Sequence, residues 1–476
     1  MKPWLTLLAG ALLMAAAPAQ ELPVPVRQAL LASRLPADSL AVWIGPLEVG
    51  SPQRLSWREH EPHNPASLAK LATTWAALEQ LGPAWHWRTP VWIQGKLDPQ
   101  SGELHGDVVL AGRGDPSLVL EHLWLLLRRL QQQGVRSVQG DFVLDNRAFE
   151  PDLATAADFD GEPWRPGNVR PDALLFNFKS WTLHIQPDPA RQVAWLSTDL
   201  PMPLSQDRVP LRAGACSDPR GTLRLNWRTQ PPRPAEATPM RLDGHWPSAC
   251  GEHRWPLADP DPNTYNHRLL AALWRELGGR LKGRVRDGWA PVAQAPTFEW
   301  SSPSLAEVVR DVNKHSNNLM AEQLALTLAL QSGLEPVGVE AARSSLQRWL
   351  QRRLGWKDGD FVWDRASGLS RHTRLSARQL AELLQVAWTS PVMPEFVASL
   401  PRAGEDGTLA RDPARFGAVI GRAHLKTGSL RDVQAMAGYV QGRSGRRYVL
   451  VALLQHPQAG QGQPVLEALL RWTYED

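Results

Sequence analysis

Cysteine and lysine are both scarce in this sequence of 476 residues, and no long apolar run follows its first 20 residues. The lack of a later run long enough to cross a bilayer excludes a polytopic membrane protein. Basic residues number 52 and acidic residues 48, without a basic block, which excludes the charge pattern of nucleic-acid-binding proteins. The histidines are scattered, and His60-Glu61-Pro62-His63 contains a proline that is foreign to a helical zinc motif. We therefore predict no metal, no cofactor and no nucleic-acid partner.

Lysine accounts for only 8 of the 52 basic residues, and arginine for the others. A lysine kept against this bias marks a position where arginine does not serve. Arginine holds its proton in proteins, whereas lysine becomes a base when burial or a neighbouring cation lowers its pKa. The lysines that need an explanation therefore include Lys70, Lys314 and Lys426.

The N-terminus is typical of a secretory signal. Lys2 precedes an apolar run over residues 5–17, and Ala17 and Ala19 favour cleavage before Gln20. We expect residues 1–19 to be removed and the protein to be periplasmic, with at most loose association with the membrane surface. A short membrane anchor is the alternative. No cysteine lies at the cleavage position, so a lipoprotein is not predicted.

Cys216 and Cys250 are the two cysteines of the chain. An even pair in an exported protein predicts one disulfide, which closes a loop of 34 residues. Two free buried thiols are the alternative.

The length predicts two to four domains. Periodicity predicts helices over residues 24–33, 118–133, 265–278, 304–313, 319–331, 338–354, 378–387 and 465–472. Strands are predicted over residues 39–44, 54–58, 89–94, 103–111, 137–144, 434–441 and 447–454. The first and last strands are expected to share one antiparallel sheet, backed by the C-terminal helix. Residues 85–262 are rich in Pro, Gly, Trp and short strands, so we predict a β-rich insert between 20–84 and 263–476.

Ser67 and Lys70 begin an Ala- and Leu-rich run that predicts a helix ending near Gly82. Their spacing places the hydroxyl and the amine on one helix face, where a neutral amine can take the hydroxyl proton. The alternative is a serine N-cap with a solvated lysine, and Ser-x-x-Lys alone is a weak motif.

Two more short motifs follow in a fixed order, Ser316-x-Asn318 and Lys426-Thr427-Gly428. Taken singly, the first is typical of a helix cap and the second of a turn at a strand end. Together with Ser67-x-x-Lys70 they form the motif triplet of the penicillin-recognising serine acyltransferases.

Each residue type suits one step of that chemistry. Ser67 attacks a carbonyl, Lys70 accepts its proton, and Ser316 passes a proton toward the leaving amine. Asn318 orients Lys70 or the substrate, and Lys426 binds a substrate carboxylate and keeps Lys70 neutral.

The strand that carries Lys426 is predicted to be an edge strand that binds the substrate. Thr427, Gly428 and Ser429 belong to this substrate-binding segment, and Gly428 leaves room for a peptide along the strand. The backbone N–H groups of Ser67 and Ser429 are expected to form an oxyanion hole.

The chain resembles the class C low-molecular-mass penicillin-binding proteins of the D-alanyl-D-alanine carboxypeptidase/endopeptidase type, peptidase family S13. The resemblance covers nearly the whole mature chain, and 249 residues separate Ser67 from Ser316, far more than in class A β-lactamases. It is carried by Pro65-Ala66-Ser67-Leu68-Ala69-Lys70-Leu71, Gly112-Arg113-Gly114-Asp115-Pro116, Gly140-Asp141-Phe142-Val143-Leu144-Asp145, Asn313-Lys314-His315-Ser316-Asn317-Asn318-Leu319-Met320-Ala321-Glu322, Ser367-Gly368-Leu369-Ser370 and Lys426-Thr427-Gly428-Ser429.

The resemblance implies an α/β (α+β) transpeptidase-like domain, an antiparallel sheet flanked by helices, with two nested smaller domains in the insert and a Cys216–Cys250 bridge. It implies a serine DD-peptidase that removes terminal D-Ala from pentapeptide stems and cleaves D-Ala–diaminopimelate crosslinks. Muropeptides are then substrates, β-lactams are inhibitors, and a homodimer is an option. An acidic residue of the insert, with Asp145 as a candidate, contacts the diamino-acid side chain. Arg365-Ala366 departs from the usual Asp-Gly-Ser-Gly pattern.

Two other functions fit the same motifs. One is a β-lactamase or esterase, against which the large insert and the lack of an obvious deacylating glutamate near Ser67 argue. The other is a vestigial peptidoglycan-binding protein, against which the intact motifs argue.

Overall fold

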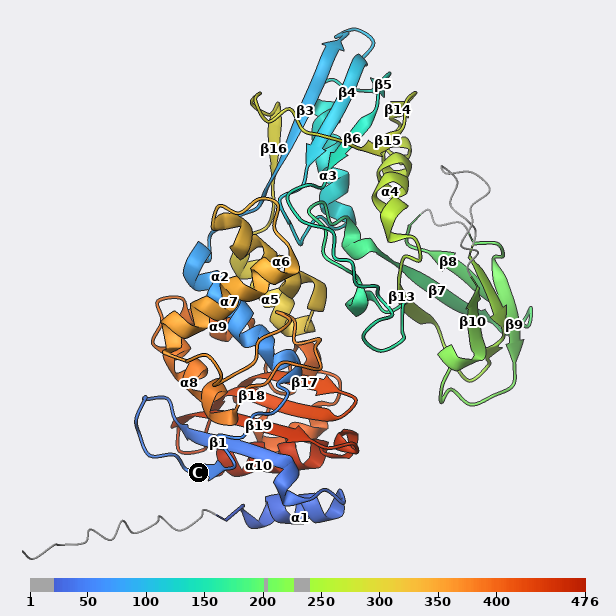
Figure 1. Cartoon of the computed structure of the whole chain (residues 1–476). Helices are drawn as coiled ribbons and strands as arrows, with labels where there is room; N and C mark the ends of the chain where they lie inside the picture. The colour runs from blue at the N-terminus through green and yellow to red at the C-terminus, as the bar shows by residue number, and fades with distance from the viewer. Residues whose placement is uncertain (1–20, 201–203, 227–239) are drawn as a thin grey trace, which may run out of the picture.

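The computed structural model describes residues 21–200, 204–226 and 240–476. The predicted signal peptide lies outside these residues. One end of the molecule combines the N- and C-terminal parts of the chain, and the middle part extends away from it (Figure 1). Within the described residues, no helix has the length and apolar character needed to cross a membrane.

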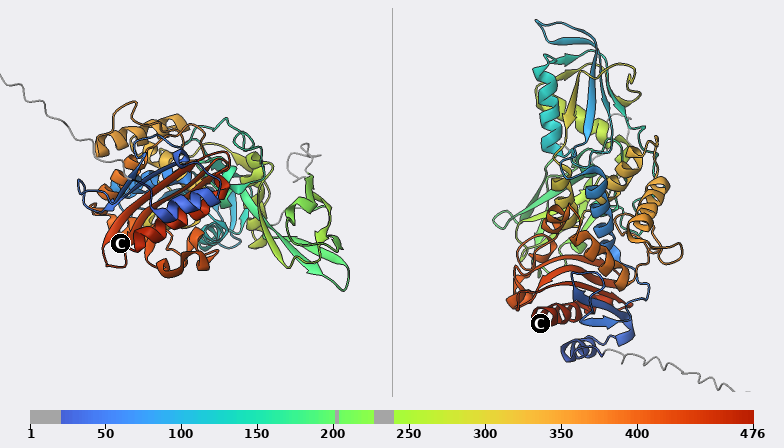
Figure 2. Two further views of the ribbon diagram at one scale, coloured as in Figure 1. Left: turned by 90° about the horizontal axis from the view of Figure 1, so that it is seen from below. Right: turned by 90° about the vertical axis from the view of Figure 1, so that its left-hand side faces the viewer.

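The central sheet joins both ends of the chain. Leu40 lies opposite Leu454, and all neighbouring strands run antiparallel, as predicted. In spatial order its strands are β17 (Ala423–Leu430), β18 (Val433–Gln441), β19 (Arg447–Gln455), β1 (Leu40–Pro46) and β2 (Leu55–Trp57). Helices α1 (Val24–Ala32) and α10 (Gln463–Tyr474) cover one face of the sheet (Figure 2).

The other face of the sheet carries a layer of helices: α2 (Ala69–Leu81), α5 (Leu305–His315), α6 (Asn318–Gln331), α7 (Val339–Leu354), α8 (Ala377–Trp388) and α9 (Met393–Ser399). Helix α2 is almost wholly buried from Ala69 to Leu78, which suits its small and apolar residues. It ends at Gly82, whose φ of 84° is a conformation that glycine adopts without strain.

The outer part of the insert is one mixed sheet with two helices. Its strands are β3 (Arg88–Leu97), β4 (Glu103–Ala111), β5 (Ser137–Val138), β6 (Phe142–Asp145), β14 (Arg280–Leu281), β15 (Val285–Asp287) and β16 (Phe298–Ser301). Helices α3 (Leu120–Gln132) and α4 (Pro262–Glu276) bury apolar side chains against it.

The inner part of the insert contains two separate sheets. A five-stranded sheet contains β7 (Ser180–Asp188), β8 (Val193–Thr198), β9 (Arg208–Arg212), β12 (Trp246–Pro247) and β13 (His253–Ala258), and a separate pair contains β10 (Leu223–Asn226) and β11 (Arg241–Gly244). Cys216 and Cys250 form the predicted disulfide here.

The sheet pairing favours a later end of the insert than the predicted residue 262. Strand β16 pairs with β3, with Phe298 opposite Val91, and β14 and β15 pair with β5 and β6. Residues 262–301 therefore complete the outer sheet before the chain returns to the helical layer. We propose that the insert ends near residue 301, with the strands of residues 180–258 nested inside it.

Candidate active site

The nucleophile candidate Ser67 lies in a 3₁₀ turn, Ala66–Leu68, directly before α2. The N-cap positions of this turn and of α2 are Pro65 and Leu68, so Ser67 is not the N-cap of either. Ala66 has a φ of 48°, a strained value for a residue with a side chain. The turn is held on two sides: Ala66 N donates to Asn64 Oδ1 at 2.9 Å, and a Cβ added to Gly368 would lie 1.9 Å from Ala66 O.

Lys70 lies one turn later, with its amine in contact with three oxygen atoms. Its Nζ is 3.0 Å from Ser67 Oγ, 2.7 Å from Asn318 Oδ1 and 2.6 Å from the Ser367 carbonyl oxygen. The side chain is fully buried. Burial first, and then the positive charge of Lys426, hold the pKa of Lys70 well below its ordinary value, while Glu322 acts in the opposite direction.

The three contacts of Lys70 define where its lone pair points. A neutral amine has two N–H bonds and one lone pair. The Asn318 amide oxygen and the Ser367 carbonyl accept the two N–H bonds, because neither of them has a proton to give. The lone pair then faces the Ser67 hydroxyl, which is the arrangement that a general base requires.

Ser316 and Asn318 come from the tight junction between α5 and α6. Ser316 ends α5 with a φ of 55°, and Asn317 begins α6 by accepting a hydrogen bond from Met320 N at 3.1 Å. Because one helix ends where the next begins, the two side chains are held at fixed angles. Asn318 Nδ2 also donates to Gly167 O of the insert at 3.2 Å.

Lys426 reaches the same place from β17. Its Nζ donates to Ser316 Oγ at 2.9 Å and to the Thr427 carbonyl at 2.7 Å. Burial lowers its pKa to about 7. The structure thus brings Ser67, Lys70, Ser316, Asn318 and Lys426 into one chain of hydrogen bonds and nearby charges.

Strand β17 is the edge strand of the sheet, as predicted, and it passes close to the Ser67 turn. A Cβ added to Gly428 would lie 2.8 Å from Pro65 O and 3.1 Å from Ser67 N. Thr427 Oγ1 lies 3.4 Å from Thr408 Oγ1, and the exposed Ser429 accepts from Gln434 Nε2 at 2.9 Å.

A pocket of about 410 Å³ opens beside these groups. It is lined on one side by residues 315–319 of the α5–α6 junction, and on the other by residues of the inner insert that include Phe178, Trp181 and Asp199. The insert therefore forms one wall of the space that a substrate would enter.

Sequence reasoning missed several neighbours of the site. The Ser367 carbonyl is a backbone group, so no side-chain motif could predict its contact with Lys70. Glu322 Oε1 accepts from Ser367 N at 2.9 Å, and its place one turn after Asn318 was a signal that could have been used. Asn64 was likewise visible, since Asn-Pro is a turn signal.

Two predicted candidates lie elsewhere in the structure. Lys314 pairs with Asp406 at 2.6 Å and donates to Leu400 O at 2.7 Å. Asp145 accepts hydrogen bonds from the Arg147 guanidinium and from Ala290 N, so its oxygens are occupied within the insert. A different acid, Asp152, accepts from Arg365 Nη1 at 3.1 Å. Arg365 lines a small pocket together with Asn318 and Glu322.

Known proteins resemble this chain in sequence. A D-alanyl-D-alanine carboxypeptidase from Actinomadura sp. (strain R39) is 28% identical over 409 residues, which cover 80% of this chain and 71% of that protein. The D-alanyl-D-alanine carboxypeptidase DacB from Haemophilus influenzae is 22% identical over 418 residues, which cover 83% of this chain and 81% of that protein.

Solved structures share the fold. Penicillin-binding protein 4 from Haemophilus influenzae superimposes with a TM-score of 0.75 at 19% identity and covers 95% of this chain and 99% of its own. A predatory endopeptidase from Bdellovibrio bacteriovorus, acylated by penicillin G and complexed with an immunity protein, has a TM-score of 0.51 at 12% identity and covers 91% of this chain and 90% of its own. The predicted penicillin-binding-protein fold is confirmed.

A family pattern accounts for most of the sequence. The one that describes the D-Ala-D-Ala carboxypeptidase 3 (S13) family matches residues 25–168 and 221–474. These residues include the three motifs and nearly all of the central sheet and the helical layer. The match, the relatives and the shared fold agree with the family resemblance of the sequence, and the chain belongs to the D-Ala-D-Ala carboxypeptidase 3 (S13) family.

Proposed function

We propose that this protein is a periplasmic serine DD-peptidase of peptidoglycan, with residues 1–19 removed as a signal and at most loose membrane association. It removes terminal D-Ala from pentapeptide stems and cleaves D-Ala–diaminopimelate crosslinks through an acyl-enzyme on Ser67. The observation that carries the proposal is the buried Lys70 amine, 3.0 Å from Ser67 Oγ, with its other two contacts to oxygens that only accept hydrogen bonds.

Acylation follows from the positions of the two amines and two hydroxyls. Ser67 Oγ attacks the carbonyl carbon of the scissile peptide bond while its proton passes to Lys70 Nζ. The C–N bond then breaks, and the leaving amine takes a proton from the Ser316 hydroxyl, which is replenished from Lys426 at 2.9 Å. Lys70 was neutral before the attack because burial and Lys426 disfavour its charged form.

Deacylation reverses the direction of proton transfer. A water molecule attacks the ester carbonyl, a neutral amine of the site takes its proton, and Ser67 Oγ leaves with a proton restored. The backbone N–H groups of Ser67 and Ser429 are the proposed oxyanion hole, and the closeness of Gly428 to Ser67 N supports this pairing of the strand and the turn.

Substrate binding is proposed along β17. A stem peptide adds as an extended strand to the edge, its terminal carboxylate pairs with Lys426, and Thr427 and Ser429 supply hydroxyls beside it. For the diamino-acid side chain we propose Asp152 instead of Asp145 because of its position: Asp152 contacts Arg365, which lines the small pocket beside Asn318. The hydrogen bonds of Asp145 are all with residues of the insert. A homodimer is compatible with this function, and light scattering measures it.

β-Lactams are proposed to acylate the same serine. Related proteins support this, since penicillin-binding protein 4 of Haemophilus influenzae has been crystallised with a β-lactam and a predatory endopeptidase of Bdellovibrio bacteriovorus has been acylated by penicillin G.

Intact-mass analysis after incubation with penicillin G tests the proposal. We expect one stable penicilloyl adduct on the wild type and none on Ser67→Ala. The matched control is Ser101→Ala, which removes an exposed serine at the β3–β4 turn and should retain the adduct. Release of D-Ala from a pentapeptide stem, lost in Ser67→Ala and kept in Ser101→Ala, identifies the natural reaction.

Two results would replace the proposal. Fast loss of penicillin without an adduct would indicate a β-lactamase or esterase on the same motifs. Neither adduct nor turnover, with a cooperative melting transition that proves folding, would indicate a vestigial peptidoglycan-binding protein.

A further inference from the structure

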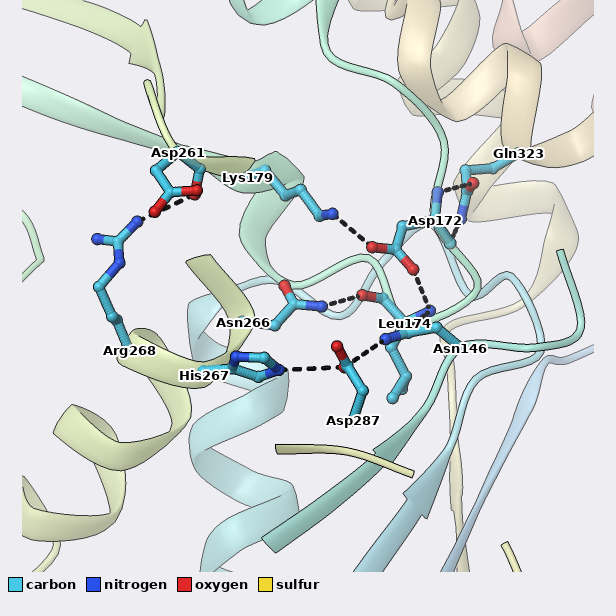
Figure 3. Close-up of polar contacts among 10 residues, drawn as sticks. All are labelled: Asn146, Asp172, Leu174, Lys179, Asp261, Asn266, His267, Arg268, Asp287 and Gln323. Atoms are coloured by element: carbon cyan, nitrogen blue, oxygen red, sulfur yellow. Dashed lines mark hydrogen bonds and ion pairs between the residues drawn. The ribbon is translucent and has the colours of Figure 1, made fainter. Parts of the chain in front are cut away.

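A second and larger cavity, of about 820 Å³, lies within the insert. It is bounded by the loop after β6, the end of β13 and the start of α4, and Figure 3 shows the polar side chains around it. Its volume is that of a small-molecule or peptide site. Val169, Arg170 and Pro171 line this cavity and also the small pocket beside Asn318, so one short segment separates it from the catalytic groups.

Two buried oxygen atoms at the cavity lack a hydrogen-bond partner among the described residues. Asn266 is only 4% exposed; its Nδ2 donates to Leu174 O at 2.7 Å, and its Oδ1 is unpaired (Figure 3). Asp259 is 5% exposed; its Oδ1 accepts from Arg268 and from Asp261 N, and its Oδ2 is unpaired. Buried polar atoms are nearly always satisfied, so two such acceptors at one cavity indicate a missing donor.

The charge of the cavity indicates what kind of donor fits. Lys179 is neutralised by Asp172 at 2.5 Å, and His267 contacts Asp287 at 3.1 Å (Figure 3). Four of the five lining acids contact a basic side chain: Asp152 contacts Arg365 and Arg170, Asp172 contacts Lys179, Asp259 contacts Arg268, and Asp287 contacts His267. Asp259 nevertheless keeps one oxygen without a partner among the described residues. An ammonium group supplies both the N–H donors and the positive charge.

One lining group is a hydrogen-bond donor and therefore requires an acceptor on the ligand. Arg170 Nε is buried and unpaired among the described residues, and it donates. The rest of the wall is largely apolar, with Phe149, Trp164 and several prolines. The matching ligand has an amine for the unpaired oxygens, a carbonyl or carboxylate for Arg170, and an aliphatic stem for the apolar wall. A diamino-acid peptide has all three parts.

We propose that this cavity binds a second stem peptide through a free primary amine, which Asp259 and Asn266 hold. The inference rests on the proposed function, because it assumes that the enzyme meets peptidoglycan peptides. Residues 166–171 connect the cavity to the active site. Gly167 O accepts a hydrogen bond from Asn318 Nδ2, and Asn318 Oδ1 accepts one from Lys70.

Binding to the penicilloylated enzyme tests this inference, since Ser67 is then blocked. The probe is the tripeptide L-alanyl-γ-D-glutamyl-meso-diaminopimelate, compared by calorimetry with the same peptide acetylated on its side-chain amine. We expect the free amine to bind at least 10-fold more tightly than the acetylated form. Ala156→Trp, which fills the cavity from its loop, and Asp259→Asn should each weaken binding at least 10-fold.

The control for added bulk is Leu153→Trp, because Leu153 is 93% exposed and is not part of the cavity wall. This variant should bind as the wild type does. Equal binding of both peptides, unchanged binding in Ala156→Trp, or no binding to the acylated enzyme overturns the inference. Full retention of binding in Asp259→Asn also overturns it, because Asp259 is then not the group that holds the amine. A failure of penicilloylation would instead refute the proposed function.

Discussion

At the scale of single residues, side-chain chemistry was predictable and backbone geometry was not. Ser67, Lys70 and Lys426 were predicted from their motifs, and the two lysines also because arginine cannot act as a base. The structure brings all three together. The Ser367 carbonyl and the positive φ of Ala66 belong to the backbone, which any residue type carries, so no motif encodes them.

The pair of buried amines predicts a shift in pH dependence. Lys426→Met removes a positive charge that lowers the pKa of Lys70, so the pKa of Lys70 rises toward its ordinary value. If acylation requires neutral Lys70, its acid limb should move to higher pH in this variant. The measurement is the rate of penicillin acylation against pH. Lys357→Met, an exposed lysine, should leave the limb in place. If the acid limb of the pH profile stays in place and only the maximal acylation rate falls, Lys426 binds the carboxylate and does not lower the pKa of Lys70.

At the scale of elements, long periodic segments were predicted well and interrupted ones were not. Residues 137–144 were expected as one strand, yet they form β5 and β6. Both halves keep the same parallel register with β4, but the Asp107 carboxylate accepts the N–H of Asp141 between them. A side chain from a neighbouring strand thus replaces one ladder bond, and a contact of this kind is set by the tertiary structure.

The contact between β17 and the Ser67 turn gives a prediction for one glycine. Gly428→Ala places a methyl group against Pro65 O and Ser67 N, which pushes the strand away from the turn. Acylation should fall about 100-fold, as when an oxyanion donor is lost, and stability should fall by about 1–3 kcal/mol from overpacking. Stopped-flow acylation and thermal melting measure the two effects. Gly460→Ala, at a site with open space, should change neither. A normal rate in Gly428→Ala would show that this contact is not needed.

At the scale of the whole molecule, composition predicted an insert that ends at residue 262, whereas the sheet pairing favours an end near residue 301. The Pro-, Gly- and Trp-rich composition gives way to helical periodicity where α4 begins. The sequence pattern therefore predicts that α4 belongs to the helical layer. The strands that follow, β14 to β16, have two to four residues each, too few for periodicity to reveal. Their pairing with β3, β5 and β6 is a long-range contact that only the folded chain displays.

The disulfide lies in the inner insert, so its loss should affect stability more than chemistry. In the chain-entropy model, a disulfide that closes a 34-residue loop raises the free energy of unfolding by about 3–4 kcal/mol. The double variant Cys216→Ser/Cys250→Ser should therefore unfold the inner insert at a lower temperature and keep the wild-type rate of Ser67 acylation. Calorimetry and penicillin kinetics measure these separately. A large fall in the acylation rate at a temperature where the variant is folded would show that the bridge supports the site.

The pairing of β1 with β19 determines when a newly made chain becomes active. The ribosome completes β1 and Ser67 early, whereas β17, Lys426 and β19 emerge near the end of synthesis. Until then the nucleophile has no edge strand beside it and no second amine to keep Lys70 neutral. A partly synthesised chain therefore holds the proposed nucleophile Ser67 without these partners, and we expect hydrolysis to begin only after the last strand has been made and the sheet has closed.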